Sequence, residues 1–155
     1  MKPVAEQGYL ILAINDEYRA CAKQLAKSLK EFHWDAKVCL LTDQDYNDPV
    51  FDYVHQLIDV DYTNPWANDW QVFYRTPFRE TIKLEADMLI ASPIDHWWTM
   101  LRHRDVVIST GCRNWRGEVS AARQYRKVFD ENNLPDVYNA ITYWRLSETA
   151  RDFFK

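Results

Sequence analysis

The chain has 155 residues and a mass of 18.5 kDa, with 47% hydrophobic residues, 27% charged residues and a formal net charge of −4 at pH 7. This composition is typical of one globular domain and argues against disorder, and the negative charge gives no support for non-specific nucleic-acid binding. The sequence has no apolar run long enough for a membrane span and no signal-peptide pattern, and its three widely separated cysteines exclude a disulfide framework and a cysteine zinc site. We therefore expect a cytoplasmic protein without membrane contact.

The first part of the chain predicts a strand–helix–strand unit. Residues 8–14 and 37–42 form short, almost entirely apolar runs, which are typical of strands buried on both faces of a parallel sheet. Between them, apolar residues recur at helical spacing from Tyr18 to Phe32, and Asn15 stands where an N-cap is expected, just before two acidic residues. No glycine-rich phosphate-binding loop joins the first strand to this helix.

The remaining elements continue the alternation of strands with helices. The pattern predicts strands at 54–60, 82–90, 105–109 and 137–145, a loop at 61–69, and helices within 70–81, from Ser92 to Arg102, over 118–130 and from Ser147 onward. Such an alternation indicates an α/β fold with a mostly parallel sheet. Ligands bind such sheets at the carboxyl ends of the strands near the switch point in strand order, so we expect the site around Asn15, Asp43 and Glu85.

The segment 82–90 carries the most informative charges. Strand alternation places apolar side chains on one side and Lys83, Glu85 and Asp87 on the other. Because an unpaired buried ion is costly, something must compensate these charges. A divalent cation would do so, since Mg²⁺ and Mn²⁺ prefer oxygen ligands. The alternative is a salt bridge between Lys83 and the two acids on an edge strand.

Four segments in this order and spacing resemble a known family: GYLILAIND, KVCLLTD, KLEADMLI and YNAITYWR. They resemble the nucleotide-diphospho-sugar transferases of the GT-A fold, of the family-eight type. They look still more like short glycosyltransferase-like proteins of T4-like phages, in which KLEADM followed by IDHWW is familiar. The resemblance covers most of 8–154 and implies a single GT-A-like domain with a Rossmann-like, mostly parallel sheet and flanking helices. Family members are commonly much longer, so the chain resembles the front part of a longer enzyme.

The resemblance implies that a nucleotide-diphosphate sugar is the donor. Its contacts would come from strand ends and from residues near them: Ala13, Ile14 and Asn15 along the base, Tyr18 stacked on it, Asp43 at the base or ribose, Arg79 or Lys83 at the phosphates or sugar, and Asn139 near the donor sugar.

The resemblance also implies a metal site. Glu85 and Asp87 would stand where the family has Asp-x-Asp and would hold Mn²⁺ or Mg²⁺ at the diphosphate. The first acid here is Glu, one methylene longer than the usual Asp. The family usually takes a third ligand, often His, from later in the chain, and here no His follows Tyr138.

These features together predict a metal-dependent glycosyltransferase of the hexosyltransferase type. It would move a sugar to the hydroxyl of a carbohydrate, a small molecule or a modified base in DNA, and no residue is marked as its general base. One alternative is a non-catalytic nucleotide-binding or partner-binding module that forms a homodimer or pairs with a second chain. Another is a nucleotidyltransferase, which would release pyrophosphate from a nucleoside triphosphate.

Aromatic residues gather in an otherwise polar stretch. They are Tyr62, Trp66, Trp70, Phe73 and Tyr74. We expect them to pin a loop to the core, and the alternative is a surface on which sugars or bases stack.

Overall fold

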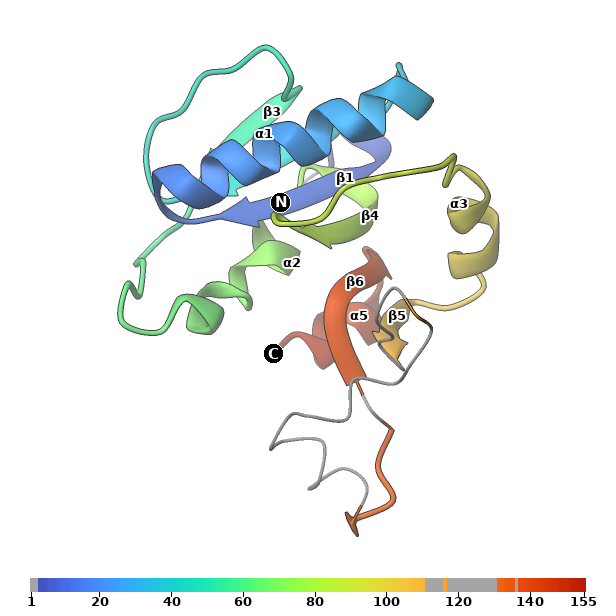
Figure 1. Ribbon diagram of the computed structural model, residues 1–155. Coiled ribbons are helices and arrows are strands. Elements are labelled where there is room, and N and C mark those ends of the chain that lie inside the picture. Colours follow the sequence, from blue (N-terminus) through green and yellow to red (C-terminus); the bar gives the residue numbers. More distant parts are fainter. Residues whose placement is uncertain (1–2, 111–115, 117–130, 136) are drawn as a thin grey trace.

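The computed structural model describes residues 3–110, 116, 131–135 and 137–155. These residues form a mixed α/β fold in which helices flank a six-stranded sheet of order β3-β2-β1-β4-β6-β5 (Figure 1). The strands are β1 (Ala5–Ala13), β2 (Val38–Thr42), β3 (Tyr53–Gln56), β4 (Phe78–Glu85), β5 (Val106–Thr110) and β6 (Val137–Arg145), and the helices are α1 (Asn15–Phe32), the 3₁₀ helix η1 (Pro65–Asn68), α2 (Gln71–Arg75), α3 (His96–Leu101) and α5 (Glu148–Phe153).

The sheet is mostly parallel, as the sequence predicts. Strands β3, β2, β1 and β4 run in one direction, and β6 pairs antiparallel with both β4 and β5. The six-stranded α/β sheet with flanking helices therefore confirms the predicted fold class. Among the described residues, no helix is both long enough and apolar enough to cross a membrane.

Each face of the sheet has its own hydrophobic core, because successive side chains of a strand point to opposite faces. On one face, Tyr9 and Ile11 of β1 pack with α1 and with Trp98 of α3. On the other face, Leu10 of β1 packs with Phe73 of α2 and with α5. Figure 1 shows α1 lying along β1, so the longest of the described helices covers the centre of the sheet. The two cores fix the sheet, and the sheet in turn fixes the ends of its strands.

A close approach between β1 and β4 requires the glycine in β1. A Cβ added at Gly8 would lie 2.4 Å from two ring atoms of Phe78, whose side chain is fully buried. The absence of a side chain at Gly8 therefore lets the Phe78 ring lie against the strand.

Most predicted elements are present, with shifted ends. The strands at 8–14, 37–42, 105–109 and 137–145 correspond to β1, β2, β5 and β6, and α1 runs to Phe32 as expected. The strand at 54–60 is shorter, since β3 ends at Gln56. The loop at 61–69 contains η1, and the helix within 70–81 is the short α2. The helix predicted at 118–130 lies outside the described residues.

Further boundary predictions were wrong, and β4 already starts at Phe78 instead of residue 82. The strand predicted at 82–90 ends at Glu85, because the backbone N–H of Met88 donates to the Glu85 carbonyl at 3.3 Å and turns the chain. The helix predicted to start at Ser92 starts at His96 instead. Ser92 was expected to cap this helix locally. Instead, the backbone N–H of Ile94 donates to His33 Nε2 at 2.8 Å, so a contact with the end of α1 holds the residues before His96.

The last helix begins as predicted. The Ser147 hydroxyl accepts a hydrogen bond from the Ala150 N–H at 3.1 Å, which is an N-cap interaction.

Candidate functional site

The carboxyl ends of β1, β2 and β4 meet at one edge of the sheet. The register places Ala13 beside Thr42 and Leu12 beside Glu85, so the three strands end at nearly the same level. Strand order reverses at this point, because β2 and β3 lie on one side of β1 while β4 lies on the other. The edge, which we call the carboxyl edge, is therefore the switch point at which such sheets bind ligands.

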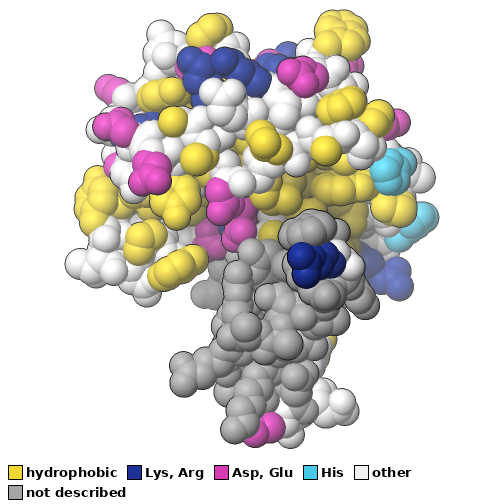
Figure 2. Space-filling model, in the orientation of Figure 1, with side chains coloured by type: hydrophobic (Ala, Val, Ile, Leu, Met, Phe, Trp, Pro, Cys, Tyr) yellow, Lys and Arg dark blue, Asp and Glu magenta, His cyan; other side chains and the backbone are white. Residues whose placement is uncertain are grey.

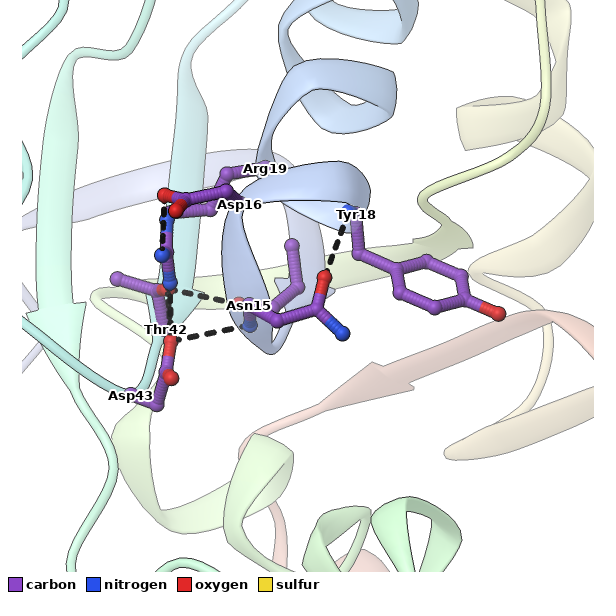
Figure 3. A network of polar contacts seen from close by, with 7 residues as sticks. Asn15, Asp16, Tyr18, Arg19, Thr42 and Asp43 are labelled. Carbon is purple, nitrogen blue, oxygen red and sulfur yellow. Dashed lines mark hydrogen bonds and ion pairs between the residues drawn. The ribbon is translucent and has the colours of Figure 1, made fainter. Parts of the chain in front are cut away.

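Asn15 connects β1 to α1 at this edge. Its φ of 72° lies in the left-handed region, which Asn tolerates better than most residues. Its side-chain Oδ1 accepts a hydrogen bond from the Tyr18 N–H at 3.1 Å, which is the capping interaction predicted from the sequence. The Tyr18 ring is half exposed and points away from the polar network shown in Figure 3. That ring is therefore accessible to a ligand at the start of the helix.

Arg19 and Asp43 form the centre of this network. The Arg19 side chain is 3% exposed, and its guanidinium contacts Asp43 from Nη1 and donates to Asp16 from Nη2 at 2.7 Å. Burial alone would lower the pKa of Arg19, but the hydrogen bond to Asp16 and the charge of Asp43 outweigh it, so the pKa is raised. Arg19 therefore stays charged and fixes the carboxylate that follows β2.

The contacts around Asp43 leave one of its oxygens for a ligand. The Asn15 N–H at 3.3 Å, the Arg19 guanidinium and the Thr42 hydroxyl at 3.1 Å all reach Oδ1 (Figure 3). Among the described residues, Oδ2 is thus the oxygen that can accept from a bound molecule.

A second polar cluster lies where β4 meets β6. The Lys83 side chain is buried, and its ammonium group donates to Asp69 Oδ2 at 2.8 Å. The Asn139 side-chain N–H donates to the same oxygen at 2.7 Å, and the Thr142 hydroxyl contacts Asn139 Oδ1. The alternative, a salt bridge between Lys83 and Glu85 and Asp87 on an edge strand, was wrong: β4 lies inside the sheet, and the ion-pair partner of Lys83 is Asp69, 14 residues away.

The two predicted metal ligands lie at the end of β4. Glu85 is the last residue of the strand and is half-buried, and Asp87 is exposed in the turn that follows. Both therefore lie at the carboxyl edge next to the tip of β1. No group of three or more His, Cys, Asp or Glu side chains placed to hold a metal ion occurs within the described ranges.

Arg79 is not brought to this edge. It is the second residue of β4, where the strand starts beside Ala5, and its exposed side chain lies 3.7 Å from Glu6. It therefore lies at the opposite edge of the sheet from Glu85. A pocket of about 400 Å³ between α2 and α5 is also separate from the predicted donor site, since its lining includes Phe73, Tyr74 and Arg151 but none of the residues predicted to bind the donor or the metal.

Sequence reasoning missed Arg19 and Asp69. Arg19 follows Asp16 by three residues on a helix, a spacing typical of ordinary surface ion pairs. The sequence near Arg19 therefore does not indicate that its side chain is buried. Asp69 stands in a loop rich in Asp and Asn, and only the charge of Lys83 inside a strand could have indicated that a partner was needed.

The chain was compared with known proteins. Models of known protein families give no match, and curated proteins give none either. Among solved structures, the galactosyltransferase LgtC, crystallised with donor and acceptor sugar analogs, has a TM-score of 0.62 at 12% identity, covering 93% of this chain and 59% of that one. The glycosyltransferase GlyE of Streptococcus pneumoniae TIGR4 has a TM-score of 0.58 at 11% identity, covering 96% and 37%. The bifunctional glycosyltransferase WbbM has a TM-score of 0.56 at 10% identity, covering 99% and 34%.

The three neighbours are all glycosyltransferases, and the fold of this chain is therefore the GT-A fold that the sequence resemblance predicts. The chain spans 59% or less of the length of each of these neighbours.

Proposed function

We propose that this chain transfers a sugar from a nucleotide-diphosphate sugar to an acceptor hydroxyl, with Mn²⁺ or Mg²⁺ at the diphosphate. The observation that carries the proposal is that Asn15, Asp43 and Glu85 lie together at the carboxyl edge of the sheet. It is supported by the similarity of this fold to those of glycosyltransferases. The proposal assigns the nucleoside to the β1–β2 half of this edge and the diphosphate and sugar to the β4–β6 half.

The β1–β2 half suits a nucleoside. Asp43 Oδ2 can accept a hydrogen bond from a base N–H or a ribose hydroxyl, and the exposed Tyr18 ring can stack on a base. The side chains of Ala13 and Ile14 are buried in the core, so only their backbone groups would line the base. The fixed position of Asp43 means that little conformational entropy would be lost when it binds.

The donor atoms at the end of β4 fit a hard divalent cation. Mg²⁺ is usually held by one or two carboxylates, with substrate phosphates and water completing its coordination, so Glu85 and Asp87 would suffice once a diphosphate is present. The charges support the same assignment. Within the described part of the chain, the buried cations Arg19 and Lys83 are already paired with carboxylates, so a metal ion would supply the positive charge that a diphosphate needs. When bound, the cation would stabilise the negative charge on the leaving nucleoside diphosphate.

The Lys83–Asp69–Asn139 cluster suits the donor sugar. The Asp69 side chain is 29% exposed, and its carboxylate can accept hydrogen bonds from sugar hydroxyls. Lys83 is occupied by Asp69, so in this proposal it orients the carboxylate and does not meet the phosphates itself. Arg79 has no role at the donor, because it lies at the opposite edge.

Nucleotide binding gives the first test. Thermal unfolding is measured with UDP, GDP and ADP, each with and without Mn²⁺, for the unaltered chain, for Asp87→Asn and for the matched control Asp35→Asn, an exposed Asp between α1 and β2. We expect one nucleotide to raise the Tm only with Mn²⁺, and we expect Asp87→Asn but not Asp35→Asn to lose this shift. Release of the matching nucleoside diphosphate from its sugar conjugates then tests transfer.

Other outcomes would separate the alternatives. Nucleotide binding without release or transfer of any sugar would favour a non-catalytic module. Release of pyrophosphate from a nucleoside triphosphate would favour a nucleotidyltransferase. A Tm that no nucleotide changes would contradict the proposal and both alternatives.

A further inference from the structure

Three aromatic side chains form an exposed row beside the candidate site. Backbone hydrogen bonds between residues three or four apart run from Asn64 through η1 and α2 to Thr76, so this stretch is helical. Trp66 lies in η1, and Trp70 and Tyr74 stand four residues apart at the start of α2 and within it, where their ring centroids lie 6.1 Å apart. They are 82%, 54% and 40% exposed, and we call them the aromatic row. The prediction that these aromatics pin a loop to the core therefore holds for Phe73, which is buried, and in part for Tyr74, whose hydroxyl donates to the Phe154 carbonyl at 3.1 Å.

Buried amides hold the opposite side of the same stretch in place. The Asn68 side chain is 1% exposed, donates to the carbonyls of Asp61 and Pro65 at 2.9 and 3.0 Å, and accepts from the Asp61 N–H at 2.9 Å. Gln71 is equally buried and accepts from the Ile58 N–H at 2.7 Å. The segment is thus fixed from within by polar groups while its largest apolar side chains face outward, as on a surface shaped for a partner.

The row is continuous with the candidate site. Asp69 lies between Trp66 and Trp70 in the chain, and it is the residue that bonds Lys83 of β4 and Asn139 of β6. Figure 2 shows hydrophobic side chains gathered over the part of the surface where Figure 1 places η1 and α2. A molecule lying on the row would therefore reach the carboxyl edge beside the donor-sugar cluster.

The charges near the row select among the acceptors left open by the sequence. Residues 58–74 include three Asp and no Lys, Arg or His. A nucleic-acid backbone would meet the three Asp of this segment, and the described cations next to the row are Arg75, which is held by the Gln56 carbonyl, and Arg151, which lines a pocket with Tyr74. A carbohydrate fits, because its C–H faces pack on aromatic rings while its hydroxyls donate to carboxylates.

We infer that the aromatic row is the acceptor-binding surface of this chain and that the acceptor is a carbohydrate. This inference rests on the proposed function and names its acceptor class. Trp66 and Trp70 would stack on the acceptor, and Tyr74 would support Trp70, since their ring centroids lie 6.1 Å apart in an edge-on arrangement.

Fluorine NMR of the full chain labelled with 5-fluorotryptophan tests the inference. Single Trp→Phe variants assign the resonances, and lactose, maltose and cellobiose are titrated as probes, with and without UDP and Mn²⁺. We expect at least one disaccharide to shift the Trp66 and Trp70 resonances and leave Trp34 unmoved. Trp34 is the matched control, because it is 85% exposed but follows the far end of α1. Trp66→Ala should weaken that binding roughly tenfold, and Trp34→Ala should leave it unchanged.

The remaining outcomes overturn the inference or separate it from the proposed function. If no disaccharide shifts either resonance, or if Trp34 shifts equally, the inference is wrong. It is equally wrong if a short single-stranded DNA shifts the row and the disaccharides do not. A UDP response without a disaccharide response leaves the proposed function standing and removes only the acceptor surface. A disaccharide response without any nucleotide response keeps a carbohydrate surface but removes its role in transfer.

Discussion

The two halves of the carboxyl edge each bury a cation and neutralise it with a carboxylate, but they differ in how the pair is held. In the β1–β2 half, Arg19 comes from a helix and contacts Asp43 and Asp16, and the Asp43 side chain is itself only 7% exposed. In the β4–β6 half, Lys83 comes from a strand and meets Asp69, whose side chain is 29% exposed. The Arg19–Asp43 pair is therefore more deeply buried than the Lys83–Asp69 pair.

This difference suggests a division of roles. A carboxylate held inside the protein has a fixed position and suits a part of the ligand that does not change during transfer, such as the nucleoside. A carboxylate that water can reach can exchange its hydrogen bonds with those of a sugar. Removing either cation would show how far the two halves differ in stability.

The largest effect is expected at Arg19. Arg19→Met leaves the buried Asp43 carboxylate without its cation, and we expect a loss of about 3–5 kcal/mol in the free energy of unfolding. Urea unfolding measures this loss. The control Arg79→Met removes an exposed guanidinium and should change stability by about 0.5 kcal/mol or less. A small effect of Arg19→Met would mean that water reaches Asp43 and that the two halves do not differ.

Asn15 tests the backbone of the same half. Asn15→Ala removes the cap to Tyr18, worth about 1 kcal/mol, and forces Ala into a left-handed φ, which costs about 1 kcal/mol more. Asn15→Gly loses the cap but tolerates the φ, so it should cost clearly less. Thermal or urea unfolding of both variants measures the difference. Equal losses would show that the φ of 72° carries no strain.

A smaller effect is expected at Lys83. Lys83→Met keeps an apolar stem inside the sheet and leaves Asp69 where water can solvate it, so we expect a loss of about 1 kcal/mol. Adding Asp69→Asn should recover part of the loss, and unfolding of the two variants checks this. A loss as large as that of Arg19→Met would contradict the contrast between the two halves.

The smallest effect concerns the loop that brings Asp69 to the site. Hydrogen bonds from Thr63 and from the Asn64 N–H lower the pKa of Asp61 below its ordinary 3.8. A lowered folded pKa means that the contribution of Asp61 to stability is present above pH 3.8 and is lost as the pH falls through the folded pKa. The fluorine resonance of Trp66 should therefore be constant at neutral pH and shift only in strong acid. In Asp61→Asn this acid shift should be absent, and its persistence would assign the shift to another group.

Much of the fold could be predicted, because its signals are local. The apolar runs of β1 and β2, the cap at Asn15 and the cap at Ser147 each act within a few residues of the chain. The end of β4 and the start of α3 were predicted wrongly. A turn at Glu85 ends β4, and a hydrogen bond between His33 and Ile94 shifts the start of α3. His33 and Ile94 are 61 positions apart, so no local pattern indicates their contact.

The candidate site was predictable only in part. Asp43 follows β2 and Glu85 is the last residue of β4, and the rule that ligands bind at the carboxyl ends of parallel strands was enough to select both. Their companions were not predictable, because Arg19 looks like a surface residue of a helix and Asp69 looks like a residue of a polar loop. Arg79 was placed wrongly because it is close to Glu85 and Asp87 in sequence but lies at the other end of the same strand.

The sequence by itself determined the alternation of strands and helices, and with it the edge at which Asn15, Asp43 and Glu85 lie, because hydrophobic periodicity and capping act over short stretches of chain. Only the tertiary structure decided which acid neutralises each buried cation and which aromatic side chains stay in solvent. Those outcomes depend on burial, and burial is set by segments that are distant in sequence and meet only when the sheet has formed.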